Sequence, residues 1–360
     1  MLIGKMKSYF EFIRYCLDES LDVPVSMQDM DWEGLFLFMQ QQALLGIGFR
    51  GIERLKAGGI DILRPLLLKW YSLSERIRLQ NELLNKRAVE LVRMLDREGF
   101  RCCILKGQGN AVLYPNPYAR TSGDIDVWVD GSRQDIMAFV RQRFPRTDLR
   151  YHHVDYPVFK DVETEVHFVP SSMNNPVHNR RLRKWFEENK DGQFRHHASL
   201  PGDVGQIPMP TNGFNVVYQL SHMMHHFFDE GIGLRQMMDY YFVLKHADCS
   251  SSDKAVLKKT LRHLGMYRFA GAVMYIMQEV FGLKEERLIV PVDVRRGKTL
   301  MGEILKGGNF GKHSGLTAHG TGVKYFLKIR RNMRFVREYP SEALCEPVFR
   351  TWHFFWRMCH

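Results

Sequence analysis

Two aspartates separated by one residue lie in an apolar, β-branched stretch, and their spacing could support metal chemistry. Asp124 and Asp126 alternate with Ile125, Val127 and Val129, a pattern typical of a β-strand. Because side chains alternate between the two faces of a strand, we expect both carboxylates on one face and the aliphatic side chains on the other. Neighbouring carboxylates repel each other unless a cation lies between them. The pair therefore predicts a site for Mg²⁺, which binds protein carboxylates together with phosphate oxygens and water.

A third acidic residue, Glu165, lies in another strand-like stretch, residues 162–168. If the two strands are neighbours, three carboxylates converge and could hold the pair of metal ions used in in-line phosphoryl transfer. Glu163 shares the side-chain direction of Glu165 and is the alternative ligand. His167 follows on the same face, either as a group that supports the ligands or as a structural residue.

Positive charge and glycine lie upstream of the aspartates and could bind phosphate. Lys106, Gly107 and Gln108 follow the apolar residues 102–105. Glycine lets backbone N–H groups approach an anion, and the N-terminus of a helix expected to begin near residue 108 favours negative charge. Lys106 and Arg120 can add positive charge at a triphosphate, although a structural ion pair is the alternative for Lys106. We therefore predict Lys106, Gly107, Gln108 and Arg120 as nucleotide-binding residues.

The order of these motifs resembles a known family. The motifs are Leu105-Lys106-Gly107, Tyr114-Pro115, Arg120, Asp124-x-Asp126 and Glu165-x-His167. They are similar to the uncharacterised nucleotidyltransferase family of the polymerase-β-like superfamily, in which a glycine-containing turn precedes an acid-x-acid strand and a third acid comes from a later strand. This chain has Lys106-Gly107-Gln108 where the superfamily usually has a Gly-Ser turn.

The resemblance implies an enzyme that moves a nucleoside monophosphate from an NTP, such as ATP, to an acceptor and releases pyrophosphate. It implies dependence on Mg²⁺ or Mn²⁺, with Asp124, Asp126 and Glu165 as metal ligands and catalytic residues. The acceptor is left open among a small molecule, a protein side chain and an RNA end. The alternatives are an RNA- or tRNA-modifying nucleotidyltransferase, suggested by the net charge of +11, and a non-catalytic nucleotide-binding protein with the same fold.

A second polar cluster lies in the C-terminal half of the chain. His222, His225 and His226 fall on one expected helix, and His222 and His226 have the i, i+4 spacing that can place two imidazoles on one metal. Core histidines and a wall of the active-site cleft are the alternatives. The resemblance extends to this segment, including Gly231 and Leu234. Arg235 and Asp239, also at i and i+4, predict either an ion pair within a helix or part of that wall.

The surrounding pattern predicts an α+β fold with a small mixed-sheet nucleotidyltransferase core embedded between two helical regions. We expect an N-terminal helical region at 1–99, the α/β core at 100–175 and a C-terminal helical region at 176–360. Within the core we expect strands at 101–106, 124–130, 149–153 and 157–168 and helices at 108–114 and 132–143. A long helix at 65–98 carries an apolar stripe interrupted only by Gln80 and Asn81. Residues 191–211 contain several prolines and glycines and predict a loop.

Composition is ordinary for a globular protein, with 45% hydrophobic and 25% charged residues among 360. No run of about 18 apolar residues is present, and the N-terminus lacks the features of a secretion signal. Six cysteines without metal-ligand spacing favour a reduced, cytoplasmic protein with no membrane partner. The net charge of +11 favours acidic partners. Residues 324–337 interleave basic and apolar residues, which predicts either an amphipathic helix with a solvated basic face or a polyanion-binding strip.

Overall fold

A four-stranded mixed sheet lies at the centre of the computed structural model, which describes residues 2–248, 250–311 and 321–359. Its order is β1-β2-β4-β3, with β2 parallel to β4 and both outer pairs antiparallel. The strands are β1 (Cys102–Ile104), β2 (Ile125–Val129), β3 (His153–Asp155) and β4 (Thr164–His167). Helices surround this sheet, so the predicted α+β class is confirmed.

The alternation of side chains along β2 gives the sheet two different faces. Ile125, Val127 and Val129 lie in a core formed with α4 and α6. Trp128 points the other way and packs against Phe186 and aromatic residues near it. Asp126, two residues before Trp128, therefore lies on the same face as Trp128.

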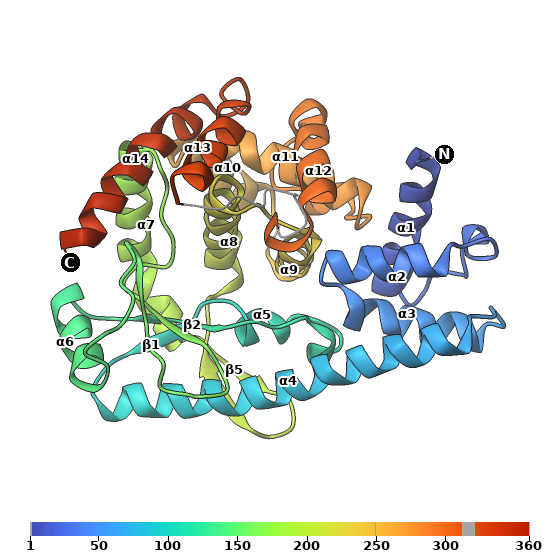
Figure 1. Cartoon of the computed structure of the whole chain (residues 1–360), viewed down its shortest axis with the longest axis horizontal. Coiled ribbons are helices and arrows are strands. Elements are labelled where there is room, and N and C mark those ends of the chain that lie inside the picture. Colours follow the sequence, from blue (N-terminus) through green and yellow to red (C-terminus); the bar gives the residue numbers. More distant parts are fainter. Residues whose placement is uncertain (1, 249, 312–320, 360) are drawn as a thin grey trace.

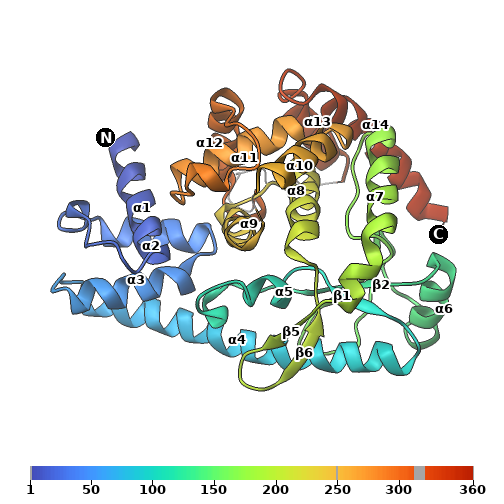
Figure 2. The same ribbon diagram turned by 180° about the vertical axis from the view of Figure 1, so that it is seen from behind.

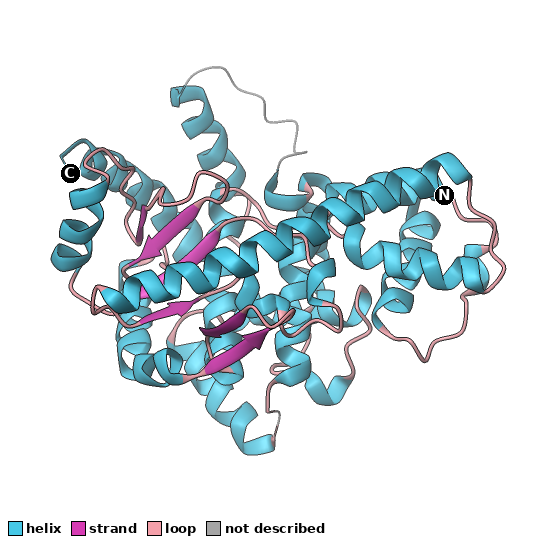
Figure 3. Cartoon of the chain, turned by 90° about the horizontal axis from the view of Figure 1, so that it is seen from below, coloured by secondary structure: helices cyan, strands magenta, loops and turns pink. Residues whose placement is uncertain are grey.

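The helix α4 (Arg64–Arg97) spans the molecule and connects its two cores. Figure 3 shows it crossing one face of the sheet. Its first half packs against the N-terminal helices, where the Trp70 indole N–H donates to the Leu45 carbonyl at 2.9 Å. Its second half, from Leu84 to Leu95, covers the aliphatic face of the sheet. The N-terminal helices are α1 (Leu2–Leu17), α2 (Trp32–Gln41) and α3 (Leu45–Ala57), and they share a core with C-terminal helices. The helix α6 (Arg133–Arg143) packs with α4 on the aliphatic face of the sheet.

Helices from the second half of the chain cover the opposite face of the sheet, as Figure 1 shows. The first two are α7 (Pro176–Arg195) and α8 (Asn212–Asp229). The remaining ones are α9 (Leu234–His246), α10 (Ser251–His263), α11 (Tyr267–Glu279), α12 (Val294–Gly307), α13 (Thr321–Met333) and α14 (Pro340–Cys359). Among the described residues, none of the helices combines the length and apolar character needed to cross a membrane.

The loop predicted at residues 191–211 is wrong. The helix α7 continues to Arg195, and a hairpin follows, formed by β5 (His197–Leu200) and β6 (Gly205–Pro208). Leu200 and Ile207 are buried against α4 and the sheet, so burial outweighs the weak strand propensity of the prolines and glycines around them. Figure 2 shows the hairpin beside α4. The domain boundaries predicted from the sequence stay a prediction. Helix α4, from the N-terminal helical region, and this hairpin, from the C-terminal one, both pack in the core on the aliphatic face of the sheet.

The basic segment 324–337 forms α13 and the turn after it, and several of its charges have acidic partners. Lys328 Nζ lies 2.8 Å from Asp229, and Arg334 Nη2 lies 3.3 Å from Glu303. Arg331 donates to the Phe227 carbonyl at 2.7 Å. These contacts favour an amphipathic packing helix over a strip that binds a polyanion.

The polar interruption in α4 has a structural role. Asn81 is fully buried, and its amide nitrogen lies 3.0 Å from the Tyr118 carbonyl and 2.8 Å from the Arg120 carbonyl. Its side-chain oxygen accepts from Ser122. Asn81 therefore fixes residues 118–122, the segment that leads directly into β2.

We expect the substitution Asn81→Leu to lower the free energy of unfolding by about 1–3 kcal/mol, because buried carbonyl groups lose their donor. Urea unfolding followed by circular dichroism measures this loss. The matched control is Gln80→Leu at the neighbouring exposed position, for which we expect a change of less than about 0.5 kcal/mol. Equal stability of the two variants would contradict this role of Asn81.

Candidate active site

Asp126 is the centre of the polar cluster on the face of the sheet covered by α8. Its carboxylate is fully buried. One oxygen, Oδ1, lies 3.1 Å from Lys106 Nζ and 2.9 Å from His167 Nε2. The other, Oδ2, is buried and has no hydrogen-bond partner among the described residues. A buried carboxylate oxygen without a donor is costly, and a bound cation would remove that cost.

Glu165 lies beside Asp126 because β2 and β4 are parallel and pair these two residues in register. Its Oε2 atom lies 3.3 Å from His167 Nε2. Asp126, Glu165 and His167 each offer a ligand atom, and these atoms lie within 4.8 Å of one another. This set of two carboxylates and one imidazole fits a divalent cation.

The charges in this cluster stabilise one another. Burial raises the pKa of Asp126, but the charge of Lys106 and the hydrogen bond from His167 outweigh it, so this pKa lies below the ordinary value. Burial likewise lowers the pKa of His167, but hydrogen bonds to Asp126 and Glu165 outweigh it and raise the pKa to about 9. The raised pKa values of His167 and Lys106 favour their positively charged forms, which compensate the charge of the neighbouring carboxylates.

The structure brings together two of the three predicted acidic ligands. Asp124 directly precedes β2 and is half-buried. Within the described part of the chain it joins none of the groups of three ligand atoms that lie within 4.8 Å. Its charge nevertheless contributes to the raised pKa of Lys106. Glu163, the alternative to Glu165, is exposed before β4, and its backbone carbonyl accepts from the Ile125 nitrogen at 2.9 Å.

Lys106 and Gly107 lie in the turn after β1, next to the carboxylates. Lys106 Nζ is 3.1 Å from Asp126 and 3.1 Å from His222 Nε2. Burial lowers the pKa of Lys106, but the charges of the nearby acids outweigh it and raise the pKa. Gly107 has φ +60° and ψ −113°, a conformation suited to glycine. The helix α5 (Gln108–Ala111) that follows is only one turn long.

The other two predicted nucleotide-binding residues face protein rather than the carboxylates. Gln108 is buried and donates to Asn85 on α4. Arg120 is 3% exposed, and its guanidinium forms two bonds of 2.8 Å with Asp239. Tyr114 donates to the same carboxylate at 2.6 Å. These contacts tie the segment before β2 to α9.

The i, i+4 spacing of Arg235 and Asp239 left open an ion pair within one helix, but the structure gives the two residues different partners. Asp239 binds Arg120, whereas Arg235 Nη1 donates to the Thr121 carbonyl at 3.1 Å. Burial raises the pKa of Asp239, but the charge and hydrogen bonds of Arg120 outweigh it and lower the pKa. A contact between α9 and residues distant in sequence cannot be read from helical spacing alone.

The three histidines of α8 form a wall over the carboxylates. His222 Nε2 lies 3.1 Å from both Lys106 Nζ and His226 Nε2. Burial, followed by the charge of Lys106, lowers the pKa of His222. His225 lies on the other side, with its ring 5.3 Å from that of His152. Of the alternatives for this helix, the position of the side chains matches a wall of the active-site cleft.

Sequence reasoning missed His152 and His153, which the structure places beside Glu165 and His167. His153 pairs with His167 across β3 and β4, and its Nδ1 atom lies 3.5 Å from Glu165 Oε2. The alternation of His153, Val154 and Asp155 was the available signal, because it places the two polar residues on one face of a strand.

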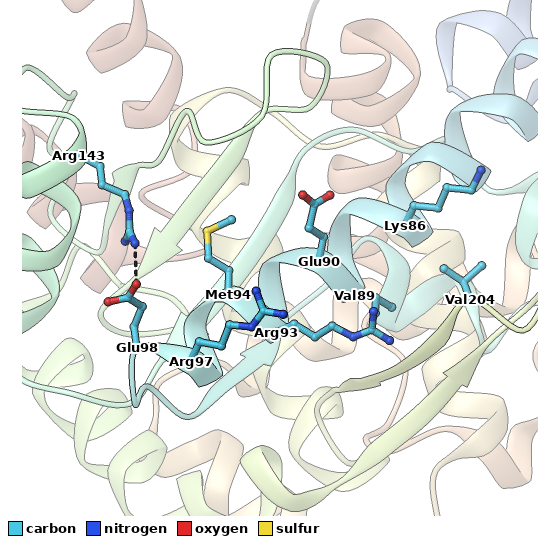
Figure 4. Close-up of a pocket in the computed structure, with 9 residues that line it drawn as sticks. All are labelled: Lys86, Val89, Glu90, Arg93, Met94, Arg97, Glu98, Arg143 and Val204. Carbon is cyan, nitrogen blue, oxygen red and sulfur yellow. Dashed lines mark hydrogen bonds and ion pairs between the residues drawn. The ribbon is translucent and has the colours of Figure 1, made fainter.

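Hollows in the described part of the surface also lie outside this cluster. A groove of about 570 Å³ runs along the outer side of α4, where Figure 4 shows Arg93 and Arg97. It lies across the sheet from Asp126 and shares no residue with the site. A second cavity, of about 490 Å³, lies at the end of α8 and is lined in part by Phe310. The Phe310 ring lies 5.3 Å from that of His226, so this cavity borders the histidine wall.

We expect Asp239→Leu to lower the free energy of unfolding by about 3–5 kcal/mol, because it leaves the buried Arg120 guanidinium without a counter-charge. The double variant Arg120→Met, Asp239→Leu should recover much of this loss, since neither charge then remains. Denaturant unfolding of the parent, both single variants and the double variant gives the coupling energy. Additive losses would show that the pair is not coupled.

Residues 28–282 match the protein family described as uncharacterised nucleotidyltransferase. The chain is also similar to the crystal structure of an antigenic nucleotidyltransferase-like protein from Paracoccidioides brasiliensis, with a TM-score of 0.38 and 11% sequence identity. That similarity covers 59% of this chain and 95% of the other. None of the curated proteins matches this sequence. Because the family match extends over more than half of its length, this chain belongs to the uncharacterised nucleotidyltransferase family.

Proposed function

We propose that this protein transfers a nucleoside monophosphate from an NTP to an acceptor in a reaction that requires Mg²⁺ or Mn²⁺ and releases pyrophosphate. One observation carries the proposal: Asp126 and Glu165 lie in register on parallel neighbouring strands, and Asp126 Oδ2 is buried without a partner. Membership of the nucleotidyltransferase family supports the reaction class.

The residues present fit a divalent cation. Asp126 and Glu165 would hold it, with Asp124 at the start of β2 as the further carboxylate beside them. When bound, such an ion supplies positive charge that neutralises the triphosphate and lowers the pKa of the attacking group.

The remaining steps follow from the positions of the protein side chains. Lys106 holds a positive charge beside the carboxylates and binds a phosphate oxygen of the NTP. The backbone of Gly107 approaches the triphosphate without hindrance from a side chain. An acceptor oxygen attacks the α-phosphorus, its proton passes to Glu165, and the bond from the α-phosphorus to the bridging oxygen breaks to release pyrophosphate. Gln108 and Arg120 act indirectly, by fixing the turns that carry Lys106 and Asp126.

The location of basic residues bears on the acceptor. The groove in Figure 4 carries Lys86, Arg93 and Arg97 of α4, the helix that covers the aliphatic face of the sheet. Asp126 lies on the other face, so these basic residues give no support to an RNA end as the acceptor. The cavity beside Phe310 borders the histidine wall and contains both acidic and basic side chains. We propose this cavity as the acceptor side of the site, which favours a small polar molecule or a protein side chain.

We expect Asp126→Asn to reduce nucleotidyl transfer by about a hundredfold or more, because a metal ligand supports several kcal/mol of transition-state stabilisation. The measurement is label transfer from each α-³²P NTP in cell extract with Mg²⁺ or Mn²⁺, with the acceptor identified by mass. Asp130→Asn is the matched control, since Asp130 follows the end of β2 and pairs with Arg101 and Lys190. Equal labelling by the parent and Asp126→Asn would refute the proposal.

We expect Lys106→Met to raise KM for the NTP roughly 10–100-fold, because a charge-assisted hydrogen bond contributes about 1.5–3 kcal/mol. Steady-state kinetics with the identified acceptor tests this. The comparison variant is Lys86→Met, which removes a lysine from the opposite side of the sheet and should leave KM unchanged. A loss confined to kcat, with KM as in the parent, would exclude a role for Lys106 in binding the NTP.

A further inference from the structure

Three imidazoles converge beside the carboxylates, and the proposed transfer reaction does not use them as a group. His152, His153 and His167 each offer a ring nitrogen, and these nitrogens lie within 4.8 Å of one another. The ring of His153 lies 4.6 Å from that of His152 and 5.1 Å from that of His167.

The backbone explains why three histidines face one side. His153 and His167 are cross-strand partners in β3 and β4, so their side chains leave the same face of the sheet. Neighbouring residues in a strand normally point in opposite directions. The chain bends at Tyr151 and His152, just before β3, and the Phe168 nitrogen donates to the His152 carbonyl at 2.9 Å. This bend places His152 on the same side as His153.

The cluster contains unused hydrogen-bonding capacity. Within the described parts of the chain, the Nδ1 atoms of His153 and His167 are buried and form no hydrogen bond, although Glu165 Oε2 lies 3.5 Å from His153 Nδ1. His167 is only 1% exposed. A buried polar nitrogen without a partner is costly unless it has a ligand.

A carboxylate oxygen lies beside two of the three imidazoles. Glu165 Oε2 lies 3.5 Å from His153 Nδ1 and 3.3 Å from His167 Nε2. In a tetrahedral zinc site the ligand atoms are roughly 3.4 Å apart, since each lies about 2.0–2.1 Å from the metal. The carboxylate has two oxygens, so Glu165 can contribute to this set and also to the carboxylate site around Asp126.

We propose that His152, His153 and His167, with Glu165, bind a transition-metal ion of the Zn²⁺ class. Imidazole nitrogen favours Zn²⁺, Co²⁺ and related ions, whereas Mg²⁺ prefers oxygen ligands. This nitrogen-rich site adjoins the oxygen-rich site and shares His167 and Glu165 with it, whereas His152 and His153 are absent from the set of ligand atoms around Asp126. It does not depend on nucleotidyl transfer, because it rests on the donor atoms alone.

The pair His222 and His226 is the other place where a metal could bind imidazole. Their Nε2 atoms lie 3.1 Å apart, but the Lys106 ammonium lies 3.1 Å from His222 Nε2. A fixed positive charge at that distance repels a cation. The cluster around His153 is therefore the better site.

Titration of the full-length, chelator-treated protein with Co²⁺ tests the proposal, because four-coordinate Co²⁺ absorbs visible light much more strongly than octahedral Co²⁺. We expect one equivalent to bind with intense visible bands, to resist excess Mg²⁺ and to be displaced by Zn²⁺. We expect His152→Gln and His153→Gln each to weaken binding at least roughly tenfold. Circular dichroism verifies the fold, and either variant suffices if the other does not fold.

Two controls locate the ion. His197→Gln removes an exposed histidine from β5, and His222→Gln removes one from the rival pair; both should bind Co²⁺ as the parent does. Failure of the parent to bind Co²⁺, displacement by Mg²⁺, or unchanged binding in both His152→Gln and His153→Gln would overturn the proposal. These readouts do not involve label transfer, so they are independent of the outcome for the Asp126→Asn variant.

Discussion

The cost of burying the Asp126 carboxylate governs the arrangement of the residues around it. A sheet packed on both faces offers no water to an ionised group, and such a group is stable only where charge and hydrogen bonds compensate for desolvation. Lys106 and His167 supply that compensation at one oxygen, and the other oxygen remains unpartnered. A cation bound at that second oxygen would offset the cost of burying it. This cost gives a physical reason why Lys106, His167 and Glu165 lie beside Asp126 on one face of the sheet.

The scaffold fixes that carboxylate through contacts made outside the strand. Residues 118–122 lead into β2, and they are held on one side by Asn81 of α4 and on the other by Asp239 of α9. Two helices far apart in sequence thus determine where β2 begins. A small sheet with strands of three to five residues has few hydrogen bonds of its own to resist displacement. Precision at the site therefore depends on buried polar contacts with helices, which are rigid elements.

Local pattern in the sequence predicted the elements that bear the chemistry. Alternation identified β2 and its two faces, the strand-like run at 162–168 predicted β4, and the acid-x-His pattern of the resembled family pointed to Glu165 rather than Glu163. Local sequence pattern could not predict contacts that depend on how the helices cover the sheet. The binding of Arg120 by Asp239 and the contact of Lys106 with His222 join residues more than 100 positions apart. The hairpin at 197–208 was missed for a related reason, since its strands are stabilised by burial against α4 rather than by their own propensity.

The register of the sheet also explains why oxygen and nitrogen ligands adjoin each other. The outer strand β3 places His153 beside His167 and Asp155 beside Glu165. The kind of potential ligand atom therefore changes from one strand to the next across the sheet. Asp126 and Glu165 form the oxygen-rich end, and the imidazoles of β3 and β4 form the nitrogen-rich end. A carboxylate between two such ends can bind a cation through each oxygen. Glu165 occupies that position, so a change in the ion at one end should be felt at the other through a single side chain.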